Sequence, residues 1–253
     1  FADFGHLTSV RRGCPGANST TRGLIFKGAD ASSPEPDQKF IDYFEIATTG
    51  NASDFGDATV LGRFGGALSN NIRGVSAGGS DPSTNTIDYV TITTTGDAAD
   101  FGDLLSTTNP TGACVGHGGI DMEILQRPSV NYMPGSGRGL FCGGETPTYV
   151  NTIDRIVIPT LGNAADFGDL VSVNGRCPAG CSSLTRGLVS GGSIPGAYLA
   201  TIDAFSLLSE GNAFDFGDLA SVAQSSYGAG GTTRAFVNLG SVSDAASNVI
   251  NYM

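Results

Sequence analysis

The sequence is poor in residues that several classes of function require. Tryptophan is absent, the only histidines are His6 and His117, and the only lysines are Lys27 and Lys39. The formal net charge is −11 at pH 7. A general nucleic-acid-binding surface needs dense lysine and arginine to contact phosphates, so we expect no nucleic-acid partner. No apolar run approaches the roughly 20 residues of a membrane-spanning helix, so we expect no membrane insertion.

Charged residues are also scarce, at 15% of the chain, but hydrophobic residues make up 40% of it and are spread evenly. A disordered chain has too few apolar residues to form a core, so this composition indicates a folded protein. The 253 residues are enough for one large all-β domain or two smaller domains. The chain begins at Phe1 rather than at methionine, and we therefore expect a processed or partial product.

The cysteines are odd in number and fit no zinc-ligand spacing. They are Cys14, Cys114, Cys142, Cys177 and Cys181. The last two, in the stretch CPAGC, could close a small disulfide, whereas buried unpaired thiols are the simpler expectation. The glycine-rich stretches GVSAGGSD and GLVSGGS are not followed by lysine and serine or threonine, so they are not phosphate-binding loops. The sequence therefore predicts no metal site and no cofactor.

The dominant feature that the chain does have is an internal repeat. The stretch NTIDYVTITTTGDAADFGDLLS at 85–106 recurs at 151–172 as NTIDRIVIPTLGNAADFGDLVS. The tripeptide DFG occurs five times, beginning at Asp3, Asp54, Asp100, Asp166 and Asp215. The intervals between these aspartates are 51, 46, 66 and 49 residues. A period near 50 residues in a β-patterned chain is typical of propeller blades.

An arginine marks a second fixed position in each repeat, at the start of a segment of the type RGLxxGG. The five arginines are Arg22, Arg73, Arg138, Arg186 and Arg234. Four of them follow the preceding DFG aspartate by 19 or 20 residues, whereas Arg138 follows Asp100 by 38. The third repeat therefore contains an insertion, which we place at about 115–134.

Each repeat can be divided into four short strands. DFGDL begins one strand, a segment of small residues such as GCPGANST forms the next, and RGLxxGG forms the third. TIDYVTI, with β-branched and aromatic residues in near-alternation, forms the fourth and returns to DFGDL through a TTGNA turn. Small residues suit a strand that is crowded against its copies near an axis. Sustained helical periodicity is absent, so the sequence predicts an all-β fold with almost no helix.

These observations predict a single five-bladed β-propeller of four-stranded blades over residues 1–253. The blades are expected at about 9–60, 61–106, 107–172, 173–221 and 222–253, the last completed by 1–8. Residues 1–8 contain DFG, and the final residues NVINYM correspond to NTIDYV. We therefore expect the N-terminal strand to join the C-terminal blade and close the ring, which would remove the open edges of the array.

The consensus NTIDYVTI-TTGNA-DFGDL followed by TRGL-xGG resembles repeats in tail-fibre and other virion structural proteins of marine phages, especially phages of cyanobacteria. The glycine pair before an aromatic strand also resembles a kelch blade, although the kelch tryptophan is absent and the phenylalanine of DFG stands in its place. The phage resemblance covers nearly the whole chain outside the insertion. It implies an appendage, tail-fibre or decoration protein in the virion, with other virion proteins or a host-surface glycan as partners, and it supplies no active-site residues.

Two other functions stay open. A stand-alone carbohydrate- or protein-binding propeller of a bacterium would be extracellular or at the cell surface. A glycosidase or lyase on a propeller scaffold needs paired acids that converge in one place, whereas the acids here are spread evenly over the repeats. We therefore expect a non-enzymatic protein, although a propeller fold by itself does not separate these functions.

The third-blade insertion is the predicted binding segment, because it alone departs from four nearly uniform repeats. Its candidate contact residues are His117, Asp121, Met122, Glu123, Leu125, Arg127 and Tyr132. The alternative is that this segment folds back and packs on its own blade.

Residues that recur in every repeat are predicted to be structural. The phenylalanines of DFG are expected in the core between blades, and they are Phe4, Phe55, Phe101, Phe167 and Phe216. The DFG aspartates are expected to cap turns. Some of the RGL arginines are expected to pair with aspartates within or between blades. His6 stands where other repeats have the second aspartate of DFGD, so we interpret it as a repeat variant rather than a catalytic residue.

Overall fold

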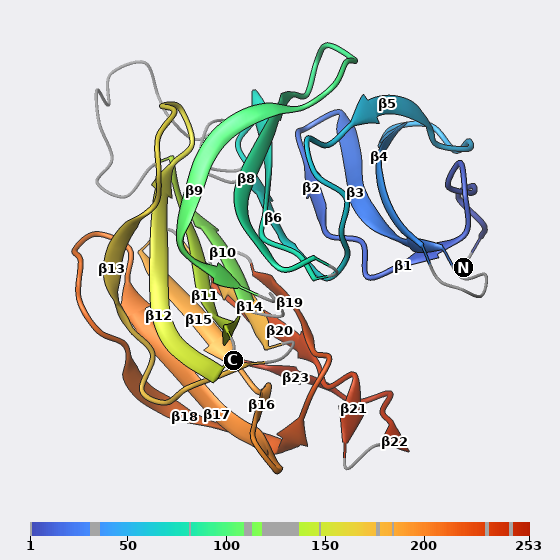
Figure 1. Ribbon diagram of the computed structural model, residues 1–253. Helices are drawn as coiled ribbons and strands as arrows, with labels where there is room; N and C mark the ends of the chain where they lie inside the picture. Colours follow the sequence, from blue (N-terminus) through green and yellow to red (C-terminus); the bar gives the residue numbers. More distant parts are fainter. Residues whose placement is uncertain are drawn as a thin grey trace.

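The computed structural model describes residues 2–30, 36–80, 82–108, 113–117, 137–146, 148–175, 178–183, 185–230, 233–242 and 245–253. Every regular element among these residues is a β-strand, which confirms the all-β prediction. The described part of the chain accordingly offers no long apolar helix that could cross a bilayer. The strands form successive antiparallel sheets that follow one another around the molecule as blades (Figure 1).

Blades one to three are each built around a meander of four antiparallel strands. Blade one contains β2 (Gly16–Asn18), β3 (Arg22–Asp30), β4 (Asp37–Glu45) and β5 (Ser53–Asp57), and β1 (Arg11–Arg12) also pairs with β3. Blade two contains β6 (Gly66–Ser69), β7 (Arg73–Ala77), β8 (Thr84–Thr91) and β9 (Ala99–Thr108). Blade three contains β10 (Ala113–His117), β11 (Arg138–Thr146), β12 (Thr148–Val157) and β13 (Ala165–Asp169).

The last two blades are less regular. Blade four contains β14 (Ala179–Ser182), β15 (Arg186–Ser190), β17 (Ala197–Ser206) and β18 (Phe214–Ala223), with β16 (Ser193–Ile194) paired to β17. Blade five has three strands, β19 (Tyr227–Gly230), β20 (Ala235–Asn238) and β23 (Ile250–Tyr252). A separate hairpin is formed by β21 (Ser241–Val242) and β22 (Ala245–Ala246). The predicted five-bladed β-propeller is therefore confirmed, with blades that are mostly four-stranded.

The innermost strands are the small-residue segments that the sequence predicts near the axis. β2 contacts β6, β6 contacts β10, β10 contacts β14, and β14 contacts β19, and these strands gather in the middle of the molecule in Figure 1. The sequences GALS in β6 and AGCS in β14 show why, because small side chains allow neighbouring blades to approach closely.

The DFG tripeptide forms a β-bulge in the outer strand. In blade two, Ile87 is opposite Gly102 and Asp88 is opposite Asp100, so Phe101 is the extra residue between them. The Asp100 carboxylate accepts a hydrogen bond from the Gly102 amide at 3.0 Å, which confirms the predicted capping role. The same aspartate-to-glycine bond occurs in all five repeats.

The bulge places its aromatic ring between blades. Phe55, Phe101 and Phe167 are each 3% exposed, so the core prediction is confirmed for these three. It is wrong for Phe4 and Phe216, which are 40% and 43% exposed. These two rings belong to the outer strands nearest the two ends of the chain, where fewer described residues surround them.

The N-terminal residues dock on blade one. The carbonyls of Phe4 and His6 accept hydrogen bonds from the amides of Gly50 and Ala52, both at 2.8 Å. None of the strand pairings among the described residues joins 2–8 to β23, and the two termini lie apart in Figure 1. Docking of this segment on the first blade is therefore observed, whereas its predicted ladder with the C-terminal blade stays a prediction.

Candidate functional site

The aspartate of each TID segment links its blade to the outer strand of the preceding blade. Asp154 accepts a hydrogen bond from the Leu105 amide, and Asp203 accepts one from the Val171 amide, both at 3.0 Å. Each donor lies five residues after a DFG aspartate. Four of these recurring acids are buried, namely Asp42, Asp88, Asp154 and Asp203. Their place in the structure is therefore at blade-to-blade contacts.

Two of these buried carboxylates have a cation beside them. Arg11 Nη2 lies 2.7 Å from the Asp42 carboxylate, and Lys27 Nζ lies 3.0 Å from that of Asp88. All four side chains are almost completely buried. A buried charge is tolerated when it is paired, so these ion pairs compensate part of the desolvation cost.

The other two acids have raised pKa values. Burial raises the pKa of Asp154 to about 6, although its hydrogen bond from Leu105 opposes the shift. Burial likewise raises the pKa of Asp203. Perturbed acids are often catalytic, but each of these accepts a hydrogen bond from the backbone of the preceding blade. We therefore assign them a structural role.

Three of the RGL arginines contact the next blade by hydrogen bonds to its backbone carbonyl groups. Arg22 Nη1 donates to the carbonyls of Ile92 and Thr93, both at 3.1 Å. Arg73 Nη1 donates to the Ile158 carbonyl at 2.9 Å, and Arg138 Nη1 donates to the Leu207 carbonyl at 3.2 Å. The observed contacts of these three arginines across the seam are with carbonyl groups, so the expected arginine–aspartate pairing of some RGL arginines stays a prediction. Arg22 also pairs with Glu45 in its own blade, at 2.8 Å.

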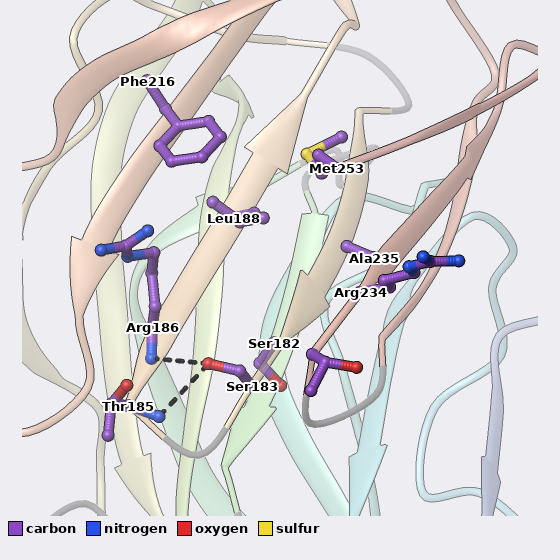
Figure 2. Close-up of a pocket in the computed structure, with 10 residues that line it drawn as sticks. Ser182, Ser183, Thr185, Arg186, Leu188, Phe216, Arg234, Ala235 and Met253 are labelled. Atoms are coloured by element: carbon purple, nitrogen blue, oxygen red, sulfur yellow. Dashed lines mark hydrogen bonds between the residues drawn. The ribbon is translucent and has the colours of Figure 1, made fainter.

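The seam between blades four and five contains an open pocket. The pocket has a volume of about 340 Å³, and Figure 2 shows Arg186 and Arg234 on opposite sides of it. Its lining residues come from β14, β15, β18, β20, the adjoining turns and the residue after β23: Ser182, Ser183, Thr185, Arg186, Leu188, Phe216, Thr233, Arg234, Ala235 and Met253. It therefore combines two cationic groups, four hydroxyls and an apolar floor.

Local hydrogen bonds fix one wall of this pocket. The Ser183 hydroxyl accepts bonds from the amides of Thr185 and Arg186, at 3.4 and 3.3 Å, which shapes the turn before β15. The Arg186 guanidinium lies 5.4 Å from the centre of the Phe216 ring, a cation–π distance. Arg22 and Arg73 lie instead over Tyr43 and Tyr89 of their own blades.

A second hollow continues the seam along β18 and β23. It has a volume of about 180 Å³ and shares Phe216 and Met253 with the first pocket. Its other lining residues are Ile202, Gly217, Asp218, Leu219, Asn251 and Tyr252. The two hollows form one candidate site. We call it the blade-four seam and define it as the residues that line either hollow.

The residues predicted to bind are mostly outside the described part of the chain. Asp121, Met122, Glu123, Leu125, Arg127 and Tyr132 fall there. His117 is the last residue of β10, opposite Arg138 in the ladder. The structure therefore leaves the insertion as a prediction.

Histidine and cysteine do not gather into a reactive centre in the described residues. Those residues contain no group of three or more histidine, cysteine, aspartate or glutamate side chains able to hold a metal ion. Cys142 and Cys181 are buried and form no disulfide, and burial raises the pKa of Cys181 to about 11. Cys177, the other half of the suggested disulfide, lies outside the described residues. Buried thiols are thus confirmed for these two positions.

The sequence did contain a signal for the blade-four seam, although it was missed. Five DFG strands are present, but only four turns of the GN or GD type precede a DFG, at Gly50, Gly96, Gly162 and Gly211. Pairing each turn with the DFG strand of the blade before it leaves the fifth strand, at Asp215, without one.

Comparison with known proteins supports the fold. A solved structure, described as the structure of YjhT, matches 96% of this chain and 84% of its own, with a TM-score of 0.73 and 9% sequence identity. A likeness at this identity concerns the fold alone. No protein-family model matches the chain, and no curated protein matches it in sequence.

Proposed function

We propose that this chain is a non-enzymatic binding propeller that serves as a structural protein of a phage virion. In this role it is an appendage, tail-fibre or decoration module that contacts other virion proteins or a host-surface glycan. The observation that carries the proposal is that the polar residues repeated in each blade form hydrogen bonds between neighbouring blades. The TID aspartates and several RGL arginines join one blade to the next, so the repeat supplies a scaffold on which particular seams and loops bind.

Binding on this scaffold has two candidate places. The first is the third-blade insertion between β10 and β11, which interrupts an otherwise uniform repeat. The second is the blade-four seam, which holds two arginines beside the half-exposed Phe216 ring. Concave sites with an apolar surface and a few polar groups are the usual form of binding sites.

A virion location is tested by immunogold labelling of purified particles, with an antibody raised against the recombinant chain. We expect labelling at an appendage or on the capsid surface. Labelling confined to the envelope of an uninfected bacterium would contradict the virion role. That result would favour the second candidate, a stand-alone binding propeller.

The role of the insertion is tested by replacing 117–132 with a short Gly/Ser connector of the length found in other blades. We expect the shortened chain to fold but to lose incorporation into particles or attachment to host cells. Unchanged incorporation and attachment would exclude the insertion as the contact. A glycan array, probed with the intact chain, separates a sugar ligand from a protein partner.

One observation favours a sugar as the ligand of the blade-four seam. The pocket places the Phe216 ring near Arg186 and the hydroxyls of Ser182, Ser183, Thr185 and Thr233. An aromatic face can cover the apolar face of a sugar while polar groups bind its hydroxyls. Saturable binding of a single glycan class that is lost in Phe216→Ala would support this candidate.

A further inference from the structure

A lysine and an aspartate are buried together in the seam between blades one and two. Lys27 Nζ lies 3.0 Å from Asp88 Oδ2, and the side chains of the two residues are 1% and 0% exposed. Lys27 belongs to β3 of blade one and Asp88 to β8 of blade two. The hydrophobic core cluster of this seam also contains residues of both blades, among them Phe26 and Ile92. The two charged groups are therefore shielded from bulk water at a contact between blades.

The chain adopts a strained backbone conformation at this lysine. Lys27 is the extra residue of a β-bulge in β3, and its φ is 50°. The next three repeats have glycine at the same position, with φ values of 66°, 71° and 67° at Gly78, Gly143 and Gly191. Glycine adopts this conformation without strain. The backbone therefore does not need a lysine here, and the lysine side chain distinguishes this position from those in the later repeats.

The contact between the two charged groups is not a hydrogen bond. Among the described residues, neither Lys27 Nζ nor Asp88 Oδ2 has a hydrogen-bond partner, although the two atoms lie 3.0 Å apart. The other carboxyl oxygen, Asp88 Oδ1, accepts a hydrogen bond from the Thr59 hydroxyl. An ammonium group has three N–H donors, and buried donors without acceptors are costly. This geometry is therefore unfavourable for a purely structural ion pair.

Two other ion pairs show what is particular to this one. Lys39 Nζ also lies 3.0 Å from an aspartate oxygen, Asp57 Oδ2, but those side chains are 51% and 34% exposed. Water solvates both charges there, so the ion pair is stable as it is. Arg11 is equally buried beside Asp42, but a guanidinium group stays protonated in proteins and is not a nucleophile. Of the two lysines in the chain, only Lys27 therefore places an amine beside a carboxyl group that is shielded from water.

We propose that Lys27 and Asp88 join covalently and form an isopeptide (amide) bond between blades one and two. The ammonium group first gives one proton to Asp88 Oδ2, which leaves a neutral amine and a neutral carboxylic acid. The amine nitrogen then attacks Asp88 Cγ, and the Thr59 hydroxyl stabilises the negative charge that develops on Oδ1. A second proton passes from the nitrogen to Oδ2, the bond between Cγ and Oδ2 breaks, and Oδ2 leaves as water.

The reaction balances without an oxidant, a reductant or a cofactor. Of the three hydrogens on the ammonium group, one stays on the amide nitrogen and two leave in the water molecule. The product has no charge, so the reaction removes two charges from a buried site, and its carbonyl oxygen Oδ1 can still accept the bond from Thr59. The bond fixes the first two blades to each other. This inference does not depend on the proposed virion role.

The test is the mass of the intact chain, purified in its folded state and denatured immediately before electrospray mass spectrometry. We expect a mass about 18 Da below that of the sequence, because one water molecule has been lost. Tryptic digestion should give a branched peptide in which residues 23–39 are joined through Lys27 to the peptide that contains Asp88. A folded chain with the full mass of its sequence would overturn the proposal.

Three variants locate the reaction, each first checked for an unchanged fold by circular dichroism. Lys27→Arg keeps the positive charge but removes the nucleophile, so it should have the full mass of its sequence. Thr59→Val removes the donor to Oδ1 and should raise the unreacted fraction about tenfold or more at a fixed time after induction. Lys39→Arg is the matched control, since Lys39 pairs with an exposed aspartate, and it should show the same mass deficit as the parent chain.

The peptide map also separates the proposal from another loss of water. An aspartate can lose water by closing a succinimide ring with its own backbone, which gives the same intact mass as the isopeptide bond. A deficit that persists in Lys27→Arg, or linear peptides that carry a dehydrated aspartate, would therefore overturn the proposal. The branched peptide in the parent chain would establish the bond even if Lys27→Arg fails to fold.

Discussion

At the scale of single residues, the buried TID aspartates are accommodated in two ways. In the first blades a cation lies beside them, and Lys27 supplies one of these cations from a position that is glycine in later repeats. Its φ of 50° is in the left-handed region, close to the φ of 66° at Gly78 and 71° at Gly143. A non-glycine residue in this conformation is strained, so the ion pair with Asp88 compensates for a local backbone cost.

Asp154 shows the second way, in which the acid becomes easier to protonate. Its pKa in the folded chain is about 6, above the ordinary value of 3.8. The folded state therefore binds more protons than the unfolded state between about pH 4 and pH 6, and this group's contribution to stability falls as the pH rises through that window. Above pH 6 the contribution is constant, because the acid is ionised in both states.

We predict that Asp154→Asn stabilises the chain at pH 7, by at most about 3 kcal/mol. The amide carries no charge, and its oxygen can still accept the bond from Leu105, as Asn251 accepts one from Ala220 at 3.0 Å. The gain should shrink as the pH is lowered to 4. Urea unfolding of the variant and the parent chain from pH 4 to 8 measures this difference.

The matched control is Asp97→Asn, in an exposed turn where the three equivalent turns already carry asparagine, at Asn51, Asn163 and Asn212. Its effect on the free energy of unfolding should stay within about 0.5 kcal/mol at every pH. A gain from Asp154→Asn that is equal at pH 4 and pH 7 would show that the buried charge is not its cause.

At the scale of elements, one tripeptide determines how each outer strand meets the next blade. The bulge at DFG turns a phenylalanine toward the seam, and the glycine that follows it leaves room for a turn of the next blade. The same bulge occurs in the four DFG segments that lie in strands. Differences in exposure among their phenylalanines therefore depend on what the neighbouring blade contributes to the contact.

We predict that Phe101→Ala lowers the free energy of unfolding by about 3–5 kcal/mol, the usual cost of removing a large buried ring. Phe101 is 3% exposed and packs edge-on against Tyr89. Phe216→Ala, at the same position of the repeat, should cost about 1 kcal/mol or less because the ring is 43% exposed. Thermal unfolding of the two variants measures both values, and equal losses would contradict the description of the blade-four seam as open.

Much of the element structure could be predicted from the sequence because each strand has its own local pattern. The spacing of the DFG tripeptides, the RGL arginines and the small-residue strands together predict five blades with the strand order that the structure shows. The acceptors of Arg73 and Arg138 could not be predicted, because they are backbone carbonyl groups. Every residue has such a group, so the residue type does not show which one accepts. The repeat pattern by itself predicts a buried ring at Phe216, and its exposure could be anticipated only from the absence of a fifth GN or GD turn before a DFG in the given sequence.

At the scale of the whole molecule, the inter-blade contacts form a chain of similar links from the N-terminal segment to blade five. The first link joins residues 4–8 to blade one, where Thr8 donates to Asp42 through its amide at 2.9 Å and its hydroxyl at 2.7 Å. This segment thus occupies, on blade one, the place that the outer strand of each blade occupies on the next. The strand β23 corresponds to the third strand of a blade, and its outer edge is where such an outer strand would pair.

The closing ladder makes a definite prediction for two backbone amides. Met253 donates to Ala235 at 3.0 Å, so by the alternation of antiparallel pairing the amides of Ile250 and Tyr252 point to the other edge of β23. If residues 2–6 pair there, hydrogen exchange of these two amides will be slow in the intact chain. Deleting residues 1–8 should make both amides exchange rapidly.

The same deletion should lower the free energy of unfolding by several kcal/mol, because the buried Asp42 carboxylate loses its two hydrogen bonds from Thr8. Rapid exchange at both positions in the intact chain would exclude closure by this strand, whereas an unchanged unfolding free energy after the deletion would exclude a stabilising role for the docked segment.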